Sequence, residues 1–391
     1  MKVMHVHHHY YPVIGGVERA IQRISEELFK LNHEVHVITS KFGAEGRPKD
    51  EVVNGVHVHR MRALRLHFSD LTIPLEAPEI LKEADAVVCW SQNSYFTYKV
   101  CRDAKRLGKP SVVYFIGVDY LEHHYNPFVR VFGHPYQKWI TRKMANLADV
   151  ALVTNDYERE LLGRGYSIDA IVLPHGIDEE YLKLPNVAEV FRRKYNIDEK
   201  IVAYIGRIHP TKGLDMLVKA FIRVAKEEPN TVLVIAGKGD GEYLKNCLKI
   251  ARRAGIEDRI KVLGYVSEED KIALIDASDV VVLPTRHTGE SYPLLINEVL
   301  ARGKRLVMTR GSIASKWVEE SGVGIVAGAD PRSLAQAIVN ELERGGAVTK
   351  NVKIPTWRDV ASELLELIQR LELHHWHTNR SSFPSCALTW R

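Results

Sequence analysis

The feature that most constrains the fold is a regular alternation of short β-branched runs with longer segments of helical periodicity. Ile201-Val-Ala-Tyr-Ile205 and Asp279-Val-Val-Val-Leu283 are nearly all apolar. A continuously apolar strand must be covered on both faces, as in a parallel sheet between two layers of helices. Apolar residues also recur at three- and four-residue steps from Val17 to Leu31, as in an amphipathic helix. The sequence therefore predicts an α/β fold.

The predicted strands fall into two groups, separated by a weaker pattern over residues 174–200. We therefore expect two doubly wound, Rossmann-like parallel-sheet domains that face a cleft, with ligands bound beyond the carboxyl ends of the strands. The first group comprises residues 2–6, 34–39, 56–60, 85–89, 111–116, 148–154 and 170–173. The second comprises residues 201–206, 231–236, 260–263, 279–283, 304–309 and 323–327.

Domain boundaries follow from this division. Residues 1–180 are assigned to an N-terminal domain and residues 181–355 to a C-terminal domain. Thr356-Trp-Arg-Asp359 is similar to a capping box, and the apolar residues after it predict a helix over about 356–373 that crosses back to the N-terminal domain. Residues 374–391 lack periodicity and acidic residues, so we expect a disordered tail.

Composition excludes several classes of protein. The 391 residues are 45% hydrophobic and 26% charged, which argues against disordered, collagen-like and coiled-coil chains. The net charge of +5 suits an anionic small molecule or an anionic membrane surface, but is too low to require nucleic acid. The four cysteines form no C-x-x-C pair, which indicates neither a zinc ribbon nor a dithiol site.

Neither a signal peptide nor a membrane span is predicted. The N-terminus lacks a long apolar stretch, and no apolar run approaches the roughly 18–20 residues that cross a bilayer. We expect a cytoplasmic protein, with peripheral association at the inner membrane face as an option. Residues 119–143 mix aromatic residues with cations, and residues 60–65 add three arginines. A membrane-facing acceptor surface and a packed helix with a solvated edge both explain this pattern.

Two glycine segments follow predicted strands. Gly15 and Gly16 precede the first helix, where a ligand can approach the backbone and a helix N-terminus favours an anion. The spacing does not match G-x-G-x-x-G, so a tight turn explains the pair as well. Gly237-Lys-Gly239 follows the strand over 231–236, and either a turn or a ligand contact accounts for it.

Two cations follow the strand over residues 201–206. Arg207 and Lys212 are five residues apart and precede a predicted helix. A planar guanidinium and a compact ammonium group both suit phosphate oxygens. Solvated surface cations are the alternative, but a position at the carboxyl end of a strand favours phosphate binding.

Two acids follow the strand over 279–283. A loop presents Glu290, Ser291 is expected to cap the next helix with Pro293 in its first turn, and Glu298 lies about two turns deeper. Free backbone N–H groups between the acids can hold a diphosphate, and a carboxylate can accept hydrogen bonds from a sugar diol. Each acid alone is equally well explained as a helix-dipole or surface acid.

Together these segments resemble a known family, the retaining GT-B glycosyltransferases that include glycogen-synthase-like and phosphatidylinositol-mannosyltransferase-like enzymes. The resemblance covers nearly the whole chain, and its most specific element is the E-x7-E pair Glu290 and Glu298. It implies transfer of a sugar from a nucleotide-diphosphate sugar to an acceptor hydroxyl with retention of configuration, without a metal or cofactor. The other matching segments are Tyr10–Glu18, Tyr204–Gly213, Gly237–Gly239 and Thr356-Trp357.

The resemblance also implies roles for individual residues. Arg207 and Lys212 would neutralise the donor diphosphate, Glu290 would contact the donor sugar and Glu298 would hold the ribose diol. The N-terminal domain would bind a sugar, lipid-linked or other hydroxyl acceptor, and the C-terminal domain the donor. Further substrate-binding residues are expected at Gly15, Gly16, Asp119, Gly237, Gly239, Tyr265, Val266, Ser291, Tyr292 and Leu294.

Two departures from the family pattern keep alternatives open. Ser291-Tyr292-Pro293 replaces the usual Gly-Phe-Gly-like residues, and Ile116 stands where a histidine is common. A nucleotide-sugar epimerase or phosphorylase on the same fold, and a non-catalytic nucleotide- or glycan-binding protein, are therefore the competing hypotheses. The run His7-His8-His9 is assigned to strand-end packing, since His8 would face away from its neighbours on a strand, and no metal site is expected.

Overall fold

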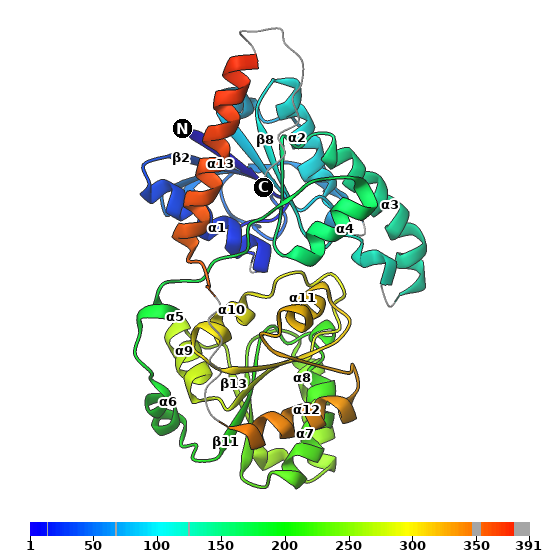
Figure 1. The fold of residues 1–391 in the computed structure, drawn as a ribbon, viewed down its shortest axis with the longest axis vertical. Coiled ribbons are helices and arrows are strands. Elements are labelled where there is room, and N and C mark those ends of the chain that lie inside the picture. The colour runs from blue at the N-terminus through cyan, green and yellow to red at the C-terminus, as the bar shows by residue number, and fades with distance from the viewer. Residues whose placement is uncertain (14, 67–68, 124–125, 346–352, 379–391) are drawn as a thin grey trace.

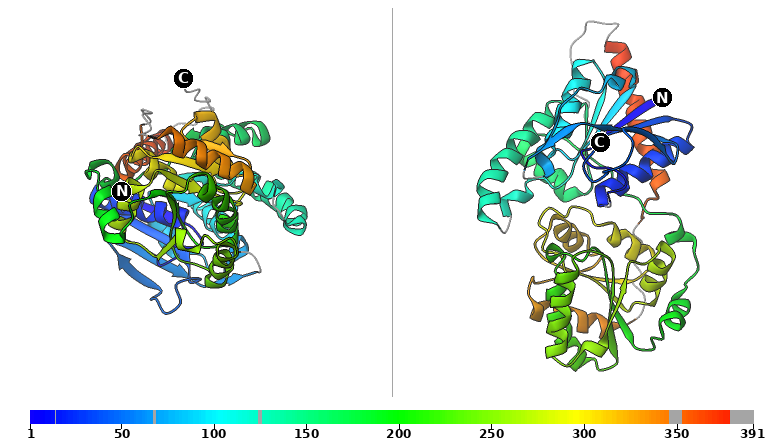
Figure 2. Two further views of the ribbon diagram at one scale, coloured as in Figure 1. Left: turned by 90° about the horizontal axis from the view of Figure 1, so that it is seen from below. Right: turned by 180° about the vertical axis from the view of Figure 1, so that it is seen from behind.

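The computed structural model describes residues 1–13, 15–66, 69–123, 126–345 and 353–378. These residues form two α/β domains, each with a parallel sheet between layers of helices, one above the other in Figure 1. The views from below and behind show the same separation into two bodies (Figure 2). The predicted α/β architecture with two Rossmann-like domains is confirmed.

The sheet of the N-terminal domain has the strand order β10-β9-β8-β7-β1-β2-β4-β3, and only β3 runs antiparallel to its neighbour. All seven predicted strands of this half are present. The prediction missed β3 and the two-stranded ribbon β5–β6. The strands are β1 (Lys2–Val6), β2 (Glu34–Ser40), β3 (Asp50–Val53), β4 (Val56–Met61), β5 (Ala63–Arg65), β6 (Thr72–Pro74), β7 (Ala86–Trp90), β8 (Ser111–Phe115), β9 (Val150–Val153) and β10 (Ile171–Val172). The α-helices are α1 (Gly16–Lys30), α2 (Tyr95–Arg106), α3 (Pro127–Ala145) and α4 (Asp156–Tyr166).

The sheet of the C-terminal domain has the order β13-β12-β11-β14-β15-β16, and every pair is parallel. All six predicted strands are present. They are β11 (Lys200–Ile205), β12 (Thr231–Ala236), β13 (Ile260–Gly264), β14 (Val280–Leu283), β15 (Arg305–Thr309) and β16 (Ile325–Ala327). The α-helices of this half are α5 (Glu180–Lys183), α6 (Ala188–Tyr195), α7 (Leu214–Glu227), α8 (Gly241–Arg253), α9 (Glu268–Ala277), α10 (Leu294–Ala301), α11 (Ile313–Ser321) and α12 (Pro331–Arg344).

Strand β11 shows why these strands are apolar throughout. Val202 and Tyr204 pack into the core on one face of the sheet, whereas Ala203 and Ile205 pack into a separate core on the other face. Successive side chains of a strand point to opposite faces, so a polar residue on either side of β11 would be buried without water.

Two chain segments connect the domains side by side. The backbone N–H of Ile177 donates to the carbonyl of Pro355 at 3.0 Å, and that of Trp357 donates to the carbonyl of Ile177 at 3.1 Å. Helix α13 (Trp357–Thr378) then packs against α1 in the core of the N-terminal domain. Its start has the predicted box, because the Asp359 carboxylate accepts from the Thr356 N–H at 2.8 Å and the Thr356 hydroxyl accepts from the Asp359 N–H at 3.2 Å.

The predicted tail needs one correction. Residues 374–378 continue α13, because the helical backbone of the preceding apolar turns extends through them. Residues 379–391, the rest of the predicted disordered tail, lie outside the described residues.

Candidate active site

The candidate site lies at the carboxyl ends of β11 and β14. These adjacent strands mark the point where the strand order of the second sheet reverses, since later strands are added on both sides of them. Open α/β sheets bind ligands beyond the carboxyl ends of the strands at such a switch point. The loop 206–213 after β11 carries Arg207 and Lys212, and the loop 284–293 after β14 carries Glu290.

Lys212 and Glu290 form an ion pair across these two loops. Their side chains are only 18% and 11% exposed, so the pair is largely shielded from water. The second carboxylate oxygen of Glu290, Oε2, is buried and has no hydrogen-bond partner among the described residues. This carboxylate can therefore accept further hydrogen bonds from a ligand.

Gly213 allows the two loops to approach. Its φ of +68° is left-handed, and a Cβ atom there would lie 1.9 Å from the carbonyl oxygen of Pro284. The backbone N–H of Arg286 donates to the carbonyl of Thr211 at 2.7 Å, which joins the loops a second time. The packing of the two loops thus requires glycine at position 213.

Arg207 is exposed at the same edge. Its backbone carbonyl accepts a 2.8 Å hydrogen bond from the hydroxyl of Tyr204, and within the described ranges no ion pair of its guanidinium is found. The group is therefore available to an anionic ligand.

The glycines of the loop after β12 pack against the loop of Arg207. A Cβ atom on Gly237 would lie 1.8 Å from the carbonyl oxygen of Gly206, and one on Gly239 would lie 2.0 Å from that of Ile208. The Ile208 N–H also donates to the carbonyl of Lys238 at 2.8 Å. Both glycines are thus explained by close backbone packing, and they support the loop predicted to bind phosphate.

Tyr265 lies at the carboxyl end of β13, beside the same loops. Its side chain is exposed, and the ammonium of Lys238 lies 4.7 Å from the centre of its ring. Val266 is half-buried against the core of the C-terminal domain. The two predicted base-contacting residues therefore differ, since Tyr265 is open to a ligand whereas the side chain of Val266 mainly packs.

Glu298 is buried on α10 and pairs with Lys271 of α9 at 2.7 Å. Its Oε2 atom, like that of Glu290, has no hydrogen-bond partner in the described part of the chain. Lys271 also lies 3.6 Å from Glu268, which pairs with Arg19 of α1 at 2.8 Å. Although burial alone would raise it, the hydrogen bond from Arg19 lowers the pKa of Glu268 to about 2. The chain of charges connects Glu298 to the N-terminal domain.

The structure corrects the role expected of Ser291. Helix α10 begins at Leu294, its N-cap is Pro293, and Glu298 lies one turn beyond its start rather than two. The Ser291 hydroxyl instead donates to Oε1 of Glu158 at 2.8 Å and accepts from the Gly117 N–H at 2.7 Å. Ser291 does not cap because it lies two residues before the N-cap and its hydroxyl is engaged by Glu158 and Gly117.

Glu158 was not predicted from the sequence. It is fully buried at the domain interface, and desolvation raises its pKa despite the hydrogen bonds that its carboxylate accepts. The sequence did contain a pattern that places Glu158 near a strand end: Asn155 caps α4, and Glu158 occupies the first turn of that helix, directly after β9. Lys271 was also missed, since a lysine in an ordinary helix carries no such signal.

Tyr292 and Leu294 also contact the N-terminal half of the chain. The Tyr292 ring lies edge-on to that of buried His175, with 5.6 Å between centres, and its hydroxyl donates to Asn297 at 2.9 Å. Leu294 packs against the core of the N-terminal domain. Both residues therefore make interdomain contacts in this structure.

The predicted residues of the N-terminal domain are placed differently from one another. Gly16 begins α1, and the direction of a Cβ atom there is open, whereas the same direction at Gly15 is filled by Glu18. Asp119 accepts a hydrogen bond from the hydroxyl of Tyr166. Gly16 is thus open to a ligand, while Gly15 and Asp119 are engaged within the protein.

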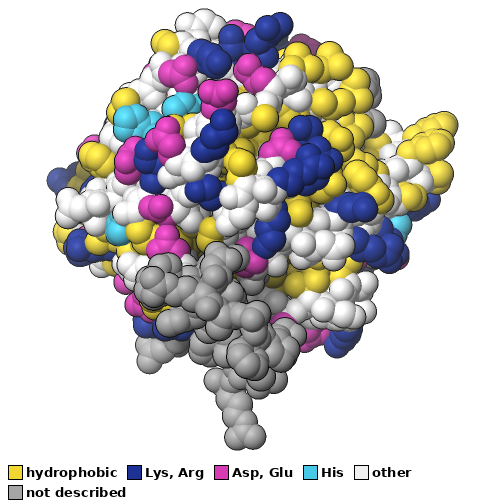
Figure 3. All heavy atoms as spheres, turned by 90° about the horizontal axis from the view of Figure 1, so that it is seen from above, with side chains coloured by type: hydrophobic (Ala, Val, Ile, Leu, Met, Phe, Trp, Pro, Cys, Tyr) yellow, Lys and Arg dark blue, Asp and Glu magenta, His cyan; other side chains and the backbone are white. Residues whose placement is uncertain are grey.

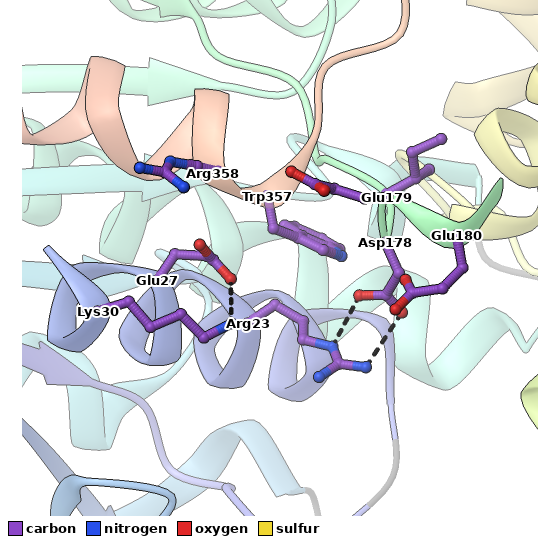
Figure 4. Close-up of a pocket in the computed structure, with 9 residues that line it drawn as sticks. Arg23, Glu27, Lys30, Asp178, Glu179, Glu180, Trp357 and Arg358 are labelled. Carbon is purple, nitrogen blue, oxygen red and sulfur yellow. Dashed lines mark hydrogen bonds and ion pairs between the residues drawn. The ribbon is translucent and has the colours of Figure 1, made fainter. Parts of the chain in front are cut away.

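A separate cavity of about 290 Å³ lies between α1, residues 177–180 and the start of α13. Figure 4 shows Arg23 directed at Asp178 beside the ring of Trp357. No predicted site residue lines it, so the cavity belongs to the connection between the domains.

Across the described ranges there is neither a cluster of three or more His, Cys, Asp or Glu side chains suited to a metal ion nor a helix long and apolar enough to cross a membrane.

The chain is similar to known glycosyltransferases. Residues 14–181 match the family model of Glycosyltransferase Family 4, and residues 187–350 match that of Glycosyl transferases group 1. The chain is 27% identical to alpha-D-kanosaminyltransferase of Streptomyces kanamyceticus over 56% of this chain and 58% of that protein. It is 24% identical to the GDP-mannose-dependent alpha-(1-6)-phosphatidylinositol monomannoside mannosyltransferase of Mycolicibacterium smegmatis, over 84% of this chain and 85% of the relative.

A solved structure extends the likeness to the fold. Anabaena HepE in complex with UDP superposes with a TM-score of 0.66 at 18% identity, over 97% of this chain and all of that one. The two family models together span both domains, and each parallel sheet lies within one of them. The chain therefore belongs to the glycosyl transferases group 1 family and is a glycosyltransferase with the GT-B fold.

Proposed function

We propose that this glycosyltransferase moves a hexose from a nucleotide-diphosphate sugar to an acceptor hydroxyl, with retention of anomeric configuration and without a metal ion or cofactor. The observation that carries the proposal is the shielded Lys212–Glu290 pair, in the same loop region as Arg207, whose guanidinium forms no ion pair within the described residues. The UDP complex of the HepE structure and the GDP-mannose dependence named for the mycobacterial relative support a diphosphate donor.

The difficult step is cleavage of the bond between the sugar and the diphosphate. Negative charge grows on the leaving phosphate, and cations fixed in advance at that position lower the barrier. Lys212 is held in place by Glu290, so its orientation is set before the donor binds. When the diphosphate interacts with the ammonium of Lys212, Glu290 can accept hydrogen bonds from the donor sugar. Its Oε2 atom has no hydrogen-bond partner among the described residues and is available for this contact.

Retention follows if the acceptor attacks from the face that the phosphate leaves. The acceptor oxygen forms its bond to the anomeric carbon as the bond from that carbon to the phosphate oxygen breaks. The proton of the acceptor hydroxyl passes to the same phosphate oxygen, so the step balances without a protein base. Arg207 and Lys212 supply the positive charge that a divalent cation supplies in metal-dependent transferases.

The nucleoside of the donor is assigned to the neighbouring strand ends. Glu298 would accept hydrogen bonds from the ribose diol through its unpartnered Oε2, and the backbone at Tyr265 and Val266 would contact the base. Gly16 would approach the phosphates from the N-terminal domain, since nothing fills the space beside it.

The test is incubation with labelled UDP-, GDP- and ADP-sugars, with and without EDTA, followed by chromatography and NMR of the anomeric centre. Acceptor-linked product with the donor's configuration, formed also in EDTA, supports the proposal. An isomerised donor indicates an epimerase, and binding without turnover indicates a non-catalytic protein. Inverted product would refute retention, and loss of activity in EDTA would refute metal independence.

A further inference from the structure

Helix α3 exposes an apolar face that the other described elements leave largely uncovered. Its residues at positions 128, 131, 132, 135 and 139 are spaced as one side of a helix. Phe128 and Phe132 are 75% and 71% exposed, and Val131 is exposed as well. Trp139 is partly covered, because its ring lies edge-on to that of Tyr98 of α2. Exposed side chains of this size, contiguous on one helix, indicate a surface that binds a partner.

The opposite face of α3 is fixed to the active-site region. The amide of buried Gln137 donates to the carbonyl of Gly117 at 2.8 Å and accepts from the Leu121 N–H at 3.1 Å. Gly117 itself approaches the loop of Glu290, because a Cβ atom on it would lie 3.4 Å from the carbonyl of Gly289. The inner face of α3 is therefore anchored through Gln137, whereas Phe128, Val131 and Phe132 on the outer face remain exposed.

The positive charge of α3 indicates which kind of partner its outer face would bind. None of its 19 residues is acidic, and Arg130, Lys138, Arg142 and Lys143 lie along it. The helix lies on the side of the N-terminal domain away from α13 (Figures 1 and 2). Viewed from above, hydrophobic side chains gather on that side next to Lys and Arg side chains (Figure 3).

We propose that the outer face of α3 docks on an anionic lipid bilayer. Apolar residues with bordering cations are the composition of a helix that lies in the interface, where each cation near the surface adds about 1 kcal/mol of attraction. A second copy of this chain would place cations against cations, which disfavours that partner. The association is interfacial, since no described helix can span the bilayer.

What membrane docking implies for the acceptor rests on the proposed function. The helical turn Tyr120–His123 precedes α3 in the chain, and the carbonyl of Tyr120 accepts a 3.3 Å hydrogen bond from the Thr288 hydroxyl, two residues before Glu290. A bilayer on α3 therefore lies close to the loop that would hold the donor sugar. The acceptor hydroxyl is then carried by a lipid-linked molecule.

The test is flotation of the full chain with vesicles of phosphatidylcholine alone or mixed equally with phosphatidylglycerol. We expect retention on the mixed vesicles, weakened by salt because exposed charges are screened. The double variant Phe128→Ser/Phe132→Ser is expected to lose binding about tenfold or more, since it removes two exposed rings that would be buried in the bilayer. Leu182→Ser, at an exposed apolar residue on α5, is the control and should bind as the wild type does.

A variant that removes cations separates the electrostatic contribution to vesicle binding from the apolar one. Lys138→Gln/Lys143→Gln, which removes a cation on each side of the apolar face, should lower binding to mixed vesicles about tenfold and leave thermal unfolding unchanged. Equal retention of either double variant and the wild type, or no retention of the wild type, would overturn the proposal. A concentration-dependent dimer that Phe128→Ser/Phe132→Ser abolishes would also overturn it, by assigning the face to a second copy.

The proposed function is tested separately by the thermal shift that UDP and GDP produce without vesicles. The α3 variants should keep the wild-type shift. A wild type that floats with vesicles but responds to no nucleoside diphosphate would support the docking surface and refute the nucleotide-sugar donor.

Discussion

The ammonium of Lys271 lies 2.7 Å from the carboxylate of Glu298, and Lys212 is paired with Glu290 in the same way. Both acids of the E-x7-E pair are thus held by a lysine from another segment, and both keep one buried carboxylate oxygen without a partner among the described residues. The lysines set the orientation of the acids, and the free oxygens give a ligand two places to donate hydrogen bonds.

Lys212→Met and Glu290→Gln should each lower kcat/KM for sugar transfer about 100-fold or more, the usual loss when one preplaced charged group is removed from a site of developing charge. Steady-state kinetics with the preferred donor measures the effect. Lys245→Met is the control, because Lys245 is 73% exposed and 3.9 Å from Glu242 in a similar but solvated pair. Near-wild-type transfer by both site variants would remove the site assignment.

Lys271→Met should destabilise the protein by about 3 kcal/mol, because it leaves the carboxylate of Glu298 buried without its cation. The double variant Lys271→Met/Glu298→Gln should recover most of that loss, since the uncompensated charge is gone. Urea unfolding followed by circular dichroism measures both. Additive losses in the double variant would show that the two residues do not interact energetically.

The stability of the protein should decrease as the pH falls from about 6.5 to about 4. Burial lowers the pKa of His175 from 6.5 to about 4, so between these values the unfolded chain binds a proton that the folded chain does not. The contribution is fully present above pH 6.5, is lost towards pH 4, and amounts to about 3 kcal/mol.

His175→Phe tests this expectation, because the ring lies among the rings of Trp90, Tyr114 and Trp357 and neither of its nitrogens has a hydrogen-bond partner in the described part of the chain. The variant should unfold with a smaller dependence on pH in that window. His57→Phe, at an exposed position of β4, should keep the wild-type slope. An unchanged slope in His175→Phe would assign the effect to other groups.

Gly213→Ala should cost about 3 kcal/mol or more and also reduce transfer, because its methyl group would collide with the carbonyl of Pro284 and displace Lys212. Gly303→Ala is a close control. Gly303 has a similar φ, +63°, but open space beside it, so only the left-handed strain of about 1–2 kcal/mol applies. Melting temperatures compare the two, and equal losses would exclude the collision.

The sheets were predictable because a strand buried on both faces must be apolar throughout, as β11 is. Strand β3 was missed because it is a four-residue edge strand whose sequence begins with two acids. The helix to residue 378 was also missed, because a pattern of apolar residues cannot show how far a helical backbone continues beyond it.

The site was predictable where local sequence places it. Arg207, Lys212 and Glu290 follow strands, so their position at one edge of the sheet could be inferred. The role of Ser291 could not, because its partner Glu158 lies 133 residues away in the sequence. Such a contact depends on how the two domains are joined, which no local pattern describes.

The parallel connections at Ile177 and Thr356 restrict how the halves of the enzyme can move. Two adjacent peptide segments joined by hydrogen bonds resist sliding and twisting, and leave bending about one line as the least hindered motion. The C-terminal segment thereby serves as the second support of a pivot, and a chain cut before residue 357 would hold its donor half by a single tether.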